Sequence, residues 1–284
     1  MKNRHKAKRF ILRFILPAVL LTAVGGASYL ISLGLGPSSV TAEPADSMEV
    51  RDSTLSRVID NVSFGVGEKL SFEVNYGFIN AGTASMEIEK LIEYEGRPCY
   101  QIVTRANSNK FFSSFYKVDD RVESITDATG LFSWKFEKRL REGGYKAERK
   151  YRFDQKQNVV YEGKDTIPVS PYAHDALSVL YYVRTLPLEV GKSVFAFNYV
   201  DGERIHLEVK VLKKEKITVQ AGTFDCLVVE PLSSTVGVFK NEGTLRVWLT
   251  DDRLRLPVLM KSKILVGSIS AELTDYRLGE IAEF

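Results

Sequence analysis

Cysteine and histidine are scarce in this chain of 284 residues, which has two cysteines and three histidines. Cys99 and Cys226 lie far apart, so the C-x-x-C spacing of redox enzymes is absent. No H-x-x-x-H pair or Cys/His cluster indicates a zinc site. The G-x-S-x-G sequence of many serine hydrolases is also missing. We therefore predict no metal site, no cofactor and no catalytic residue, and expect the protein not to be an enzyme.

A strong excess of charge of one sign is also missing once the N-terminus is set aside. Six of the 39 basic residues precede Phe14, with no acidic residue among them. The rest of the chain has 33 basic and 36 acidic side chains, a net charge of −3. This balance argues against binding to a polyanion, and we expect no nucleic-acid partner.

An uncharged apolar run begins at Phe14, directly after the basic residues, and ends at Leu35. About 20 apolar residues in a helix span the hydrocarbon core of a bilayer, and a basic flank stays in the cytoplasm. Residues 1–36 therefore predict a signal anchor with the rest of the chain exported. A signal peptide cleaved after Ala42 stays open as an alternative, because small residues precede that bond.

The exported part divides into a linker and one domain. Residues 37–60 are polar and aperiodic, which is typical of a flexible linker. Residues 61–284 repeatedly alternate apolar and polar side chains, as in residues 134–140, where Trp134 and Phe136 fall on one apolar face. Short glycine-containing turns favour antiparallel hairpins. We expect an all-β fold: a single antiparallel β-domain curled into an open barrel.

An internal echo suggests that the barrel has two similar halves. The sequence Val-Gly-Glu at residues 66–68 returns 124 residues later as Val-Gly-Lys at residues 190–192, each time before a predicted strand. Cys99 has a counterpart in Cys226, three residues out of step with that offset. Chance, or the residue pattern that all β-strands share, stays open as an explanation, and the two halves are a hypothesis.

One short helix is expected at the barrel opening, over residues 171–185. Ser170 is a good N-cap, and Pro171 suits the first helical position. The apolar face contains, at helical spacing, Leu177, Leu180 and Tyr181. This face either packs against the sheet or acts as a lid, in which case these three residues contact a ligand.

Five segments then carry a family resemblance. They are residues 66–74 (VGEKLSFEV), 81–83 (AGT), 175–184 (DALSVLYYVR), 219–226 (VQAGTFDC) and 247–251 (VWLTD). In this order, over roughly residues 64–280, the chain resembles the bacterial exported family known as domain of unknown function 3108 (DUF3108). The resemblance implies a β-rich protein of the cell envelope. It would be held in the inner membrane by one N-terminal span with its body in the periplasm, or secreted there if cleaved. It implies no catalytic residues.

Basic residues crowd one predicted hairpin, residues 135–152. The candidates for a patch that binds an anionic surface are Lys138, Arg139, Arg141, Lys146 and Arg149. Such a patch attracts anionic lipid head groups or polysaccharide. The alternative is a solvated outer face or a protected sheet edge, where Lys and Arg deter pairing with another strand.

An aromatic cluster, Phe111, Phe112, Phe115 and Tyr116, is a second candidate site. Alternation cannot bury all four side chains on one face of a strand. The cluster is therefore either core at a strand crossing or an exposed apolar rim at the mouth of a cavity. In the second case Phe111, Phe112 and Phe115 contact the ligand.

The remaining titratable residues favour structural roles. His174 precedes Ser178 by one helical turn, but we interpret it as a surface or capping histidine rather than a catalytic base. The pairs Asp119-Asp120 and Asp251-Asp252 are expected at turns or strand ends. A disulfide between the two cysteines stays open, because the sequence does not give their separation.

The function we favour is non-enzymatic binding of an apolar ligand such as lipid or acyl chains. Two alternatives stay open: a structural or interaction module of an envelope complex, whose protein partner the sequence does not identify, and an enzyme acting on envelope glycan or lipid. An interior cavity lined by apolar side chains would favour the first over the second. A cleft with convergent carboxylates would favour the enzyme.

Overall fold

The computed structural model describes residues 55–233, 245–263 and 267–282. The predicted anchor or signal peptide, residues 1–36, and most of the predicted linker lie outside these residues. Within the described part of the chain, no helix is long and apolar enough to cross a bilayer.

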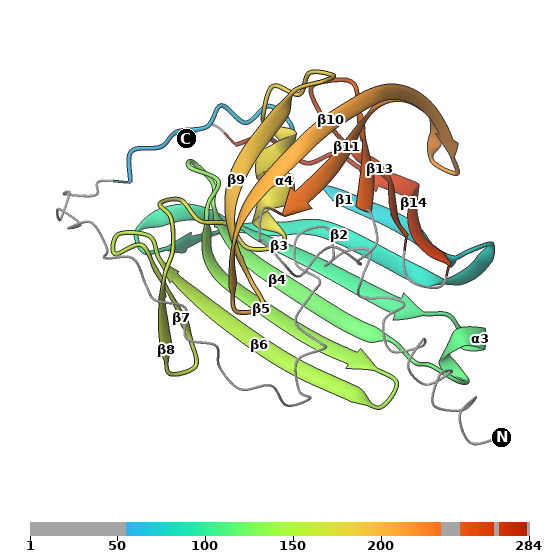
Figure 1. Cartoon of the computed structure of the whole chain (residues 1–284), viewed down its shortest axis with the longest axis horizontal. Helices are drawn as coiled ribbons and strands as arrows, with labels where there is room; N and C mark the ends of the chain where they lie inside the picture. Colours follow the sequence, from blue (N-terminus) through green and yellow to red (C-terminus); the bar gives the residue numbers. More distant parts are fainter. Residues whose placement is uncertain (1–54, 234–244, 264–266, 283–284) are drawn as a thin grey trace, which may run out of the picture.

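Fourteen strands and two short helices make up the described chain (Figure 1). Before the longer helix come β1 Lys69–Tyr76, β2 Ile79–Tyr94, β3 Arg97–Ser108, α3 Lys110–Ser113, β4 Asp119–Asp127, β5 Ser133–Glu142, β6 Tyr145–Asp154, β7 Val159–Glu162 and β8 Asp165–Pro168. From that helix onward come α4 Ser178–Arg184, β9 Ser193–Val200, β10 Glu203–Val219, β11 Gly222–Ser233, β12 Leu245–Thr250, β13 Pro257–Lys263 and β14 Ser268–Arg277.

All fourteen strands form one antiparallel sheet, in the order β8-β7-β6-β5-β4-β3-β2-β1-β14-β13-β12-β11-β10-β9. Strands β1–β8 form one meander and β9–β14 a second, and the two join where β1 pairs with β14. Strands β8 and β9 end the sheet, so backbone pairing does not close it. Figure 1 shows the sheet curling until β9 and β10 return over β5 and β6, with α4 inside the curl. The predicted all-β antiparallel class is confirmed.

The two meanders share a distinctive corner. The Gly67 amide donates to Ile88, whose own amide donates back to Glu68, each at 2.9 Å. At the matching corner, the Gly191 amide donates to Val211, whose amide donates back to Lys192, again at 2.9 Å. Gly67 and Gly191 have φ angles of 86° and 85°, a conformation that glycine adopts without strain. The sequence echo therefore marks equivalent backbone geometry.

The core fills the inner face of the curled sheet. On β1, Leu70, Phe72 and Val74 are buried while the residues between them are partly exposed, as alternation predicts. Leu177 and Tyr181 of α4 pack into the same cluster. Burial of apolar surface at about 25 cal/mol per Å² is the main stabilising term for such a sheet.

Strand β5 departs from strict alternation at its start. Ile125 of β4 pairs with Lys135, but Thr126 pairs with Ser133, so Trp134 is an extra residue in a β-bulge. Trp134 packs with Cys99 in a small separate cluster, whereas Phe136 lies in the main core. Both side chains are buried, but the prediction that they share one face is wrong, because the bulge shifts the phase.

Helix α4 begins seven residues later than predicted. The Asp175 carboxylate accepts hydrogen bonds from the amides of Leu177 and Ser178, at 2.7 and 2.9 Å, so it caps the chain there. Upstream, His174 pairs with β9: its amide donates to Phe197 and its carbonyl accepts from Tyr199. These strand-like bonds override the Ser170-Pro171 start signal.

The two cysteines are free and buried in separate clusters. Cys99 lies beside Trp134, and Cys226 beside Trp248. The open question of a disulfide is therefore answered: none forms between them. Each thiol acts as a small apolar side chain.

Candidate functional site

Phe78 and Phe111, the two most exposed phenylalanines of the described residues, lie at one end of the sheet, whereas the exposed Phe195 and Phe197 lie on the edge strand β9. Phe78, in the turn between β1 and β2, is fully exposed, and Ile79 beside it is exposed. Phe111 of α3 and Phe115 just after it are 66% and 50% exposed. We call these four residues the apolar loop end. Large exposed apolar groups gathered in one place mark an interaction site more often than scattered single ones do.

Local hydrogen bonds fix the two loops against each other. Asn109 caps α3 by accepting from the Phe112 amide at 2.9 Å. Its side-chain amide donates to the carbonyl and to the side-chain oxygen of Asn80, each at 2.8 Å. Phe112 is buried and anchors α3, and its ring lies 5.1 Å from that of Phe115. The exposed rings therefore project from a fixed scaffold.

Basic side chains outnumber acidic ones around the apolar loop end, where the exposed Asp119 lies 3.9 Å from Arg141. Residues 109–118 contain Lys110 and Lys117, both exposed, and no acidic residue. Across the neighbouring hairpin, Arg141 and Lys146 are exposed as well. Exposed aromatic rings beside Lys and Arg are typical of surfaces that sit at the head-group level of a bilayer.

The aromatic rim predicted from the sequence is only partly exposed, because Phe112 belongs to the core.

The predicted basic patch divides between the two faces of the sheet. Arg139, Arg141 and Lys146 are exposed, while Arg149 is half-buried and bonds to Glu162 at 2.7 Å. Lys138 points inward and is almost fully buried, with its ammonium 2.5 Å from Asp201. The prediction that Lys138 belongs to a solvated patch is therefore wrong. Alternation along β5 sends it to the inner face.

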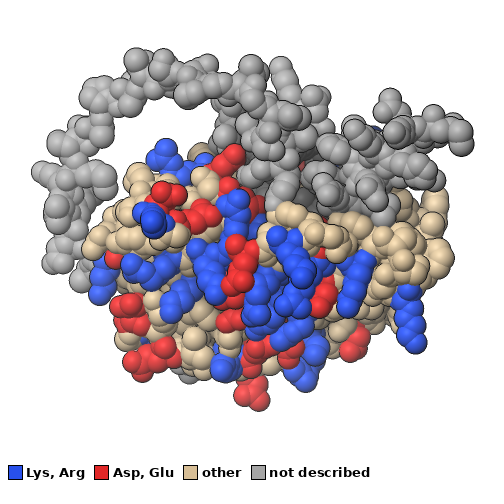
Figure 2. All heavy atoms as spheres, turned by 90° about the horizontal axis from the view of Figure 1, so that it is seen from below, with Lys and Arg blue, Asp and Glu red and all other residues tan. Residues whose placement is uncertain are grey.

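The outer face of β5 and β6 carries acids among its bases. Figure 2 shows Lys and Arg side chains interleaved with Asp and Glu on the side of the molecule below β6 in Figure 1. Glu137 pairs with Arg139 at 3.0 Å and with Lys150 at 3.7 Å. Lys150 also pairs with Glu148 at 2.8 Å. This mixture weakens the face as a general anion-binding surface.

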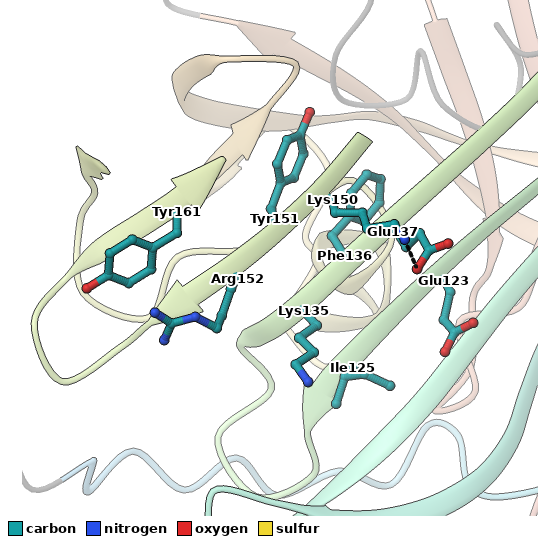
Figure 3. A pocket seen from close by; sticks show the side chains of 9 residues that line it. All are labelled: Glu123, Ile125, Lys135, Phe136, Glu137, Lys150, Tyr151, Arg152 and Tyr161. Atoms are coloured by element: carbon teal, nitrogen blue, oxygen red, sulfur yellow. Dashed lines mark ion pairs between the residues drawn. The ribbon is translucent and has the colours of Figure 1, made fainter. Parts of the chain in front are cut away.

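A pocket of about 370 Å³ opens on strands β4–β7 (Figure 3). Its lining residues are Glu123, Ile125, Lys135, Phe136, Glu137, Lys150, Tyr151, Arg152 and Tyr161. Figure 3 marks the ion pair between Lys150 and Glu137, and the Arg152 guanidinium lies 4.0 Å from the centre of the Tyr161 ring. Lys150, Glu137 and Arg152 therefore already have partners among the lining residues, while Glu123 pairs with Arg121 and Gln101 outside the lining.

The predicted ligand residues of the helix are largely covered. Leu177 and Tyr181 are 2% and 0% exposed, and Leu180 is partly buried against the same core. The helix packs inside the curl of the sheet rather than over an open mouth. Whether these residues meet a ligand stays a prediction.

A buried ion pair at the end of α4 escaped the sequence reasoning. Arg184 makes two hydrogen bonds with Glu68, each 2.7 Å long, and both side chains are shielded from water. The same guanidinium donates to the carbonyls of Ser63 and Leu254. These contacts tie the N-terminal segment, α4 and the second meander together. The one available signal was an arginine at an apolar-face position of the predicted helix.

His174 and Ser178 lie close together but do not form a catalytic triad. The Ser178 hydroxyl is 3.3 Å from His174 Nδ1, but Asp175 accepts from the hydroxyls of Ser124 and Ser133 instead of orienting the histidine. Burial lowers the pKa of His174 well below its usual value. The prediction of a surface histidine is wrong, since its ring is enclosed and stacks on Tyr182.

Metal binding finds no support in the described ranges, where no three His, Cys, Asp or Glu side chains are grouped to hold an ion. Asp119 is exposed and Asp120 buried, both at the start of β4, as expected for a strand end. Asp252 caps the turn between β12 and β13 by accepting from the Leu254 amide at 2.9 Å. These acids therefore have structural partners.

Comparison with known structures shows the fold. The crystal structure of a β-barrel-like protein of domain of unknown function DUF1849 from Brucella abortus aligns with a TM-score of 0.52 and 10% identity, over 77% of this chain and 100% of that chain. A DUF1089 family protein from Pseudomonas aeruginosa aligns with a TM-score of 0.36 and 9% identity, over 64% of this chain and 90% of that one. The first likeness supports a β-barrel-like fold and nothing about activity.

Sequence comparison gives the family. No curated protein matches the chain. Residues 71–274, from β1 to β14, match the family described as protein of unknown function DUF3108. The match covers most of the chain and contains four of the five segments that carried the resemblance and part of the first, so this protein belongs to the DUF3108 family.

Proposed function

We propose that this protein is a non-enzymatic lipid-binding protein of the bacterial cell envelope, and that it contacts acyl chains with the apolar loop end. The observation that carries this proposal is the grouping of Phe78, Phe111 and Phe115 as exposed rings at one end of the sheet. Bringing an exposed Phe side chain out of water contributes about 1.5–3 kcal/mol. Each nearby Lys adds roughly 1 kcal/mol on an anionic membrane.

The proposed location is the inner membrane, with the β-domain in the periplasm. The apolar run from Phe14 to Leu35 supports a span, and residues 37–54 connect it to the described domain. About 18 residues reach at most roughly 60 Å. Strand β2, with 16 residues, is roughly 53 Å long. The covalent connection is therefore long enough for the apolar loop end to meet the membrane that holds the N-terminus.

A depth measurement tests the proposal. The full-length chain carrying Phe111→Cys is labelled with an environment-sensitive fluorophore and placed in phosphatidylethanolamine and phosphatidylglycerol vesicles that contain brominated lipid. The native cysteines will not compete, because both are buried and burial raises the pKa of each thiol to about 12. We expect strong quenching at position 111.

The matched control is Glu93→Cys, an exposed site near the end of β2 that is opposite to Ile79 and the apolar loop end. It should show little quenching in the same vesicles. Equal quenching at both positions, or none at position 111, would contradict lipid contact by the loop end.

The finer hypothesis places an acyl chain inside the barrel against Leu177, Leu180 and Tyr181. The side-chain filling of the core means that a guest would have to displace these residues. If so, Leu177→Ser with Leu180→Ser will reduce saturable uptake of a fluorescent fatty acid more than Phe78→Ser does. The opposite order supports binding at the loop end.

A second candidate function is an interaction module of an envelope complex. It is favoured by the inner face of the sheet, which is filled by side chains. A partner protein would therefore contact the exposed surface of the domain. Under this function, full-length protein in vesicles shows no quenching at position 111 and purifies free of lipid in native mass spectrometry.

We further infer two similar β-units in the fold, supported by the matching bonds at Gly67 and Gly191.

A further inference from the structure

Two buried carboxyl groups meet directly beneath the apolar loop end. Asp120 lies at the start of β4 and Glu142 ends β5, and both side chains are almost completely buried. Each carboxyl group acts on the pKa of the other as a close neighbour. In the described part of the chain, Asp120 Oδ2 and Glu142 Oε1 are buried without a hydrogen-bond partner. One proton shared between the two groups would satisfy both oxygens and remove one of two buried negative charges.

This corner holds the segment that carries the exposed rings. The Tyr116 hydroxyl donates to Glu142 Oε2 at 3.4 Å, and Val118 forms a β-bridge with Glu142. The Gly143 amide donates to the carbonyl of Lys117 at 2.7 Å. A Cβ on Gly143 would lie 2.9 Å from the Tyr116 ring, so the loop packs tightly on the β5–β6 hairpin. Residues 109–118 are thus attached to β5 at the carboxyl pair.

Few charges compensate the pair. The Arg141 amide donates to Asp120 Oδ1 at 2.7 Å, and Asp119 on the same strand adds negative charge. Lys138 acts on both carboxyls, but its ammonium is already paired with Asp201 at 2.5 Å.

Tyr116 faces the pair from the loop, and Tyr145 is the register partner of Glu142 on β6. Burial, together with the negative charge of Asp120, raises the pKa of Glu142 to about 8, and burial raises the pKa of Asp120 to about 6.

We propose that the Asp120–Glu142 carboxyl pair is a proton-dependent latch that fixes the apolar loop end in its lipid-contacting position and releases it when the shared proton is lost. The lipid-contacting part of this inference rests on the proposed function, whereas the latch itself is a property of the fold. Loss of the proton leaves two buried negative charges in contact. Their repulsion separates β4 from the end of β5, and the attached loop loosens with them.

The direction of the pH effect follows from the raised pKa of Glu142. A carboxyl group whose pKa is higher in the folded state binds its proton more tightly there than in the unfolded chain. The stabilisation is complete below about pH 4.5, the ordinary value for Glu, and is lost as the pH rises through about 8. The domain is therefore expected to be less stable at pH 9 than at pH 6.

Thermal unfolding of the full-length chain in detergent tests the latch without lipid. We expect the melting temperature of the wild type to fall by about 5 °C between pH 6 and pH 9. Glu142→Gln keeps a neutral side chain that donates to Asp120, and should remove most of this fall. Asp120→Asn, from the other side of the pair, should do the same. Glu148→Gln, an exposed site on β6, should leave the fall intact.

The lipid readout separates the latch from the proposed function. With the fluorophore at position 111, wild-type quenching should fall at least twofold from pH 6 to pH 9, while Glu142→Gln keeps the pH 6 value throughout. If Glu142→Gln shows the same fall in melting temperature and in quenching as the wild type, the latch is overturned. If quenching is absent at every pH while Glu142→Gln still flattens the melting profile, the latch stands and the lipid-binding function is overturned.

Discussion

The sheet meets itself in two places, and the two contacts are of opposite kinds. At the junction of the two meanders, β1 and β14 share a ladder of eight residue pairs in which Phe72 faces Leu273, and both side chains are buried. At the other contact, which we call the seam, the turn between β9 and β10 lies against β5, β6 and β7. Asp201 at that turn pairs with Lys138, and the Tyr199 hydroxyl donates to Glu162 at 2.8 Å.

The difference shows how this fold curls without closing. A barrel closes when its first and last strands pair along their backbones. Here β8 and β9 end the sheet, and part of the β9 edge is taken by His174. The seam is then sealed by charged and hydroxyl side chains above a layer of aromatic packing, in which the Tyr199 ring lies 5.2 Å from that of Tyr151. Side-chain ion pairs depend on salt and on protonation, whereas an apolar ladder depends on packing. The junction should therefore behave as the rigid part of the molecule and the seam as the responsive part.

The largest effect is expected beside the junction, where Glu68 precedes β1. Arg184→Met leaves the Glu68 carboxylate buried without its partner, which should reduce the free energy of unfolding by about 3–5 kcal/mol. Urea denaturation measures it. Adding Glu68→Met should recover much of the loss, because the isolated charge is then gone. If Arg184→Met alone has a stability close to that of the wild type, the Arg184–Glu68 pair does not hold this region together.

A smaller effect is expected at the seam. Asp201→Asn removes the charge opposite Lys138, whose side chain is only 7% exposed, and should cost about 1–3 kcal/mol. The matched control is Glu189→Gln, which removes an exposed pair with Lys192 and should cost less than about 0.5 kcal/mol. Urea midpoints at low and high salt provide the comparison. If the wild type and Asp201→Asn respond to salt identically, the seam is not sealed by charge.

The smallest effect on stability is expected at the apolar loop end. Phe78→Ser should change the free energy of unfolding by no more than about 0.5 kcal/mol, because the ring is fully exposed. Phe72→Ala, a buried phenylalanine at the junction, should cost about 3–5 kcal/mol. Phe78→Ser should nevertheless lower the quenching at position 111 in vesicles. Unchanged quenching would show that Phe78 takes no part in lipid contact.

Local patterns predicted most of the strands but not their faces or ends. Alternation correctly marks Phe136 as buried, and it also sends Lys138 inward, which a count of basic residues overlooked. Trp134 changed face because a bulge inserts one residue, and a bulge depends on the partner strand. The helix start moved to Ser178 because His174 found backbone partners on β9. Each miss arises from a contact distant in sequence.

The sequence identified only part of the candidate site, again because some of its contacts join residues that are distant in the chain. The Phe-Phe-x-x-Phe spacing singled out Phe111 and Phe115, but Phe78 is a lone phenylalanine in a turn 33 residues earlier than Phe111. The bond between Asn109 and Asn80 brings the two loops together, and no local pattern contains it. The carboxyl pair is similar: Asp120 and Glu142 are 22 residues apart and meet because β4 and β5 are adjacent strands.

The sequence by itself determined the antiparallel β class and the family, because period-2 alternation, glycine turns and the order of short segments are local properties. It also suggested two similar halves, and the structure shows equivalent corners at Gly67 and Gly191, where a positive φ angle favours glycine. Only the tertiary structure decided that β1 joins β14, that Arg184 is buried with Glu68, and that Asp120 meets Glu142. These contacts join residues distant in the chain, and their energies come from burial and charge, which no local pattern encodes.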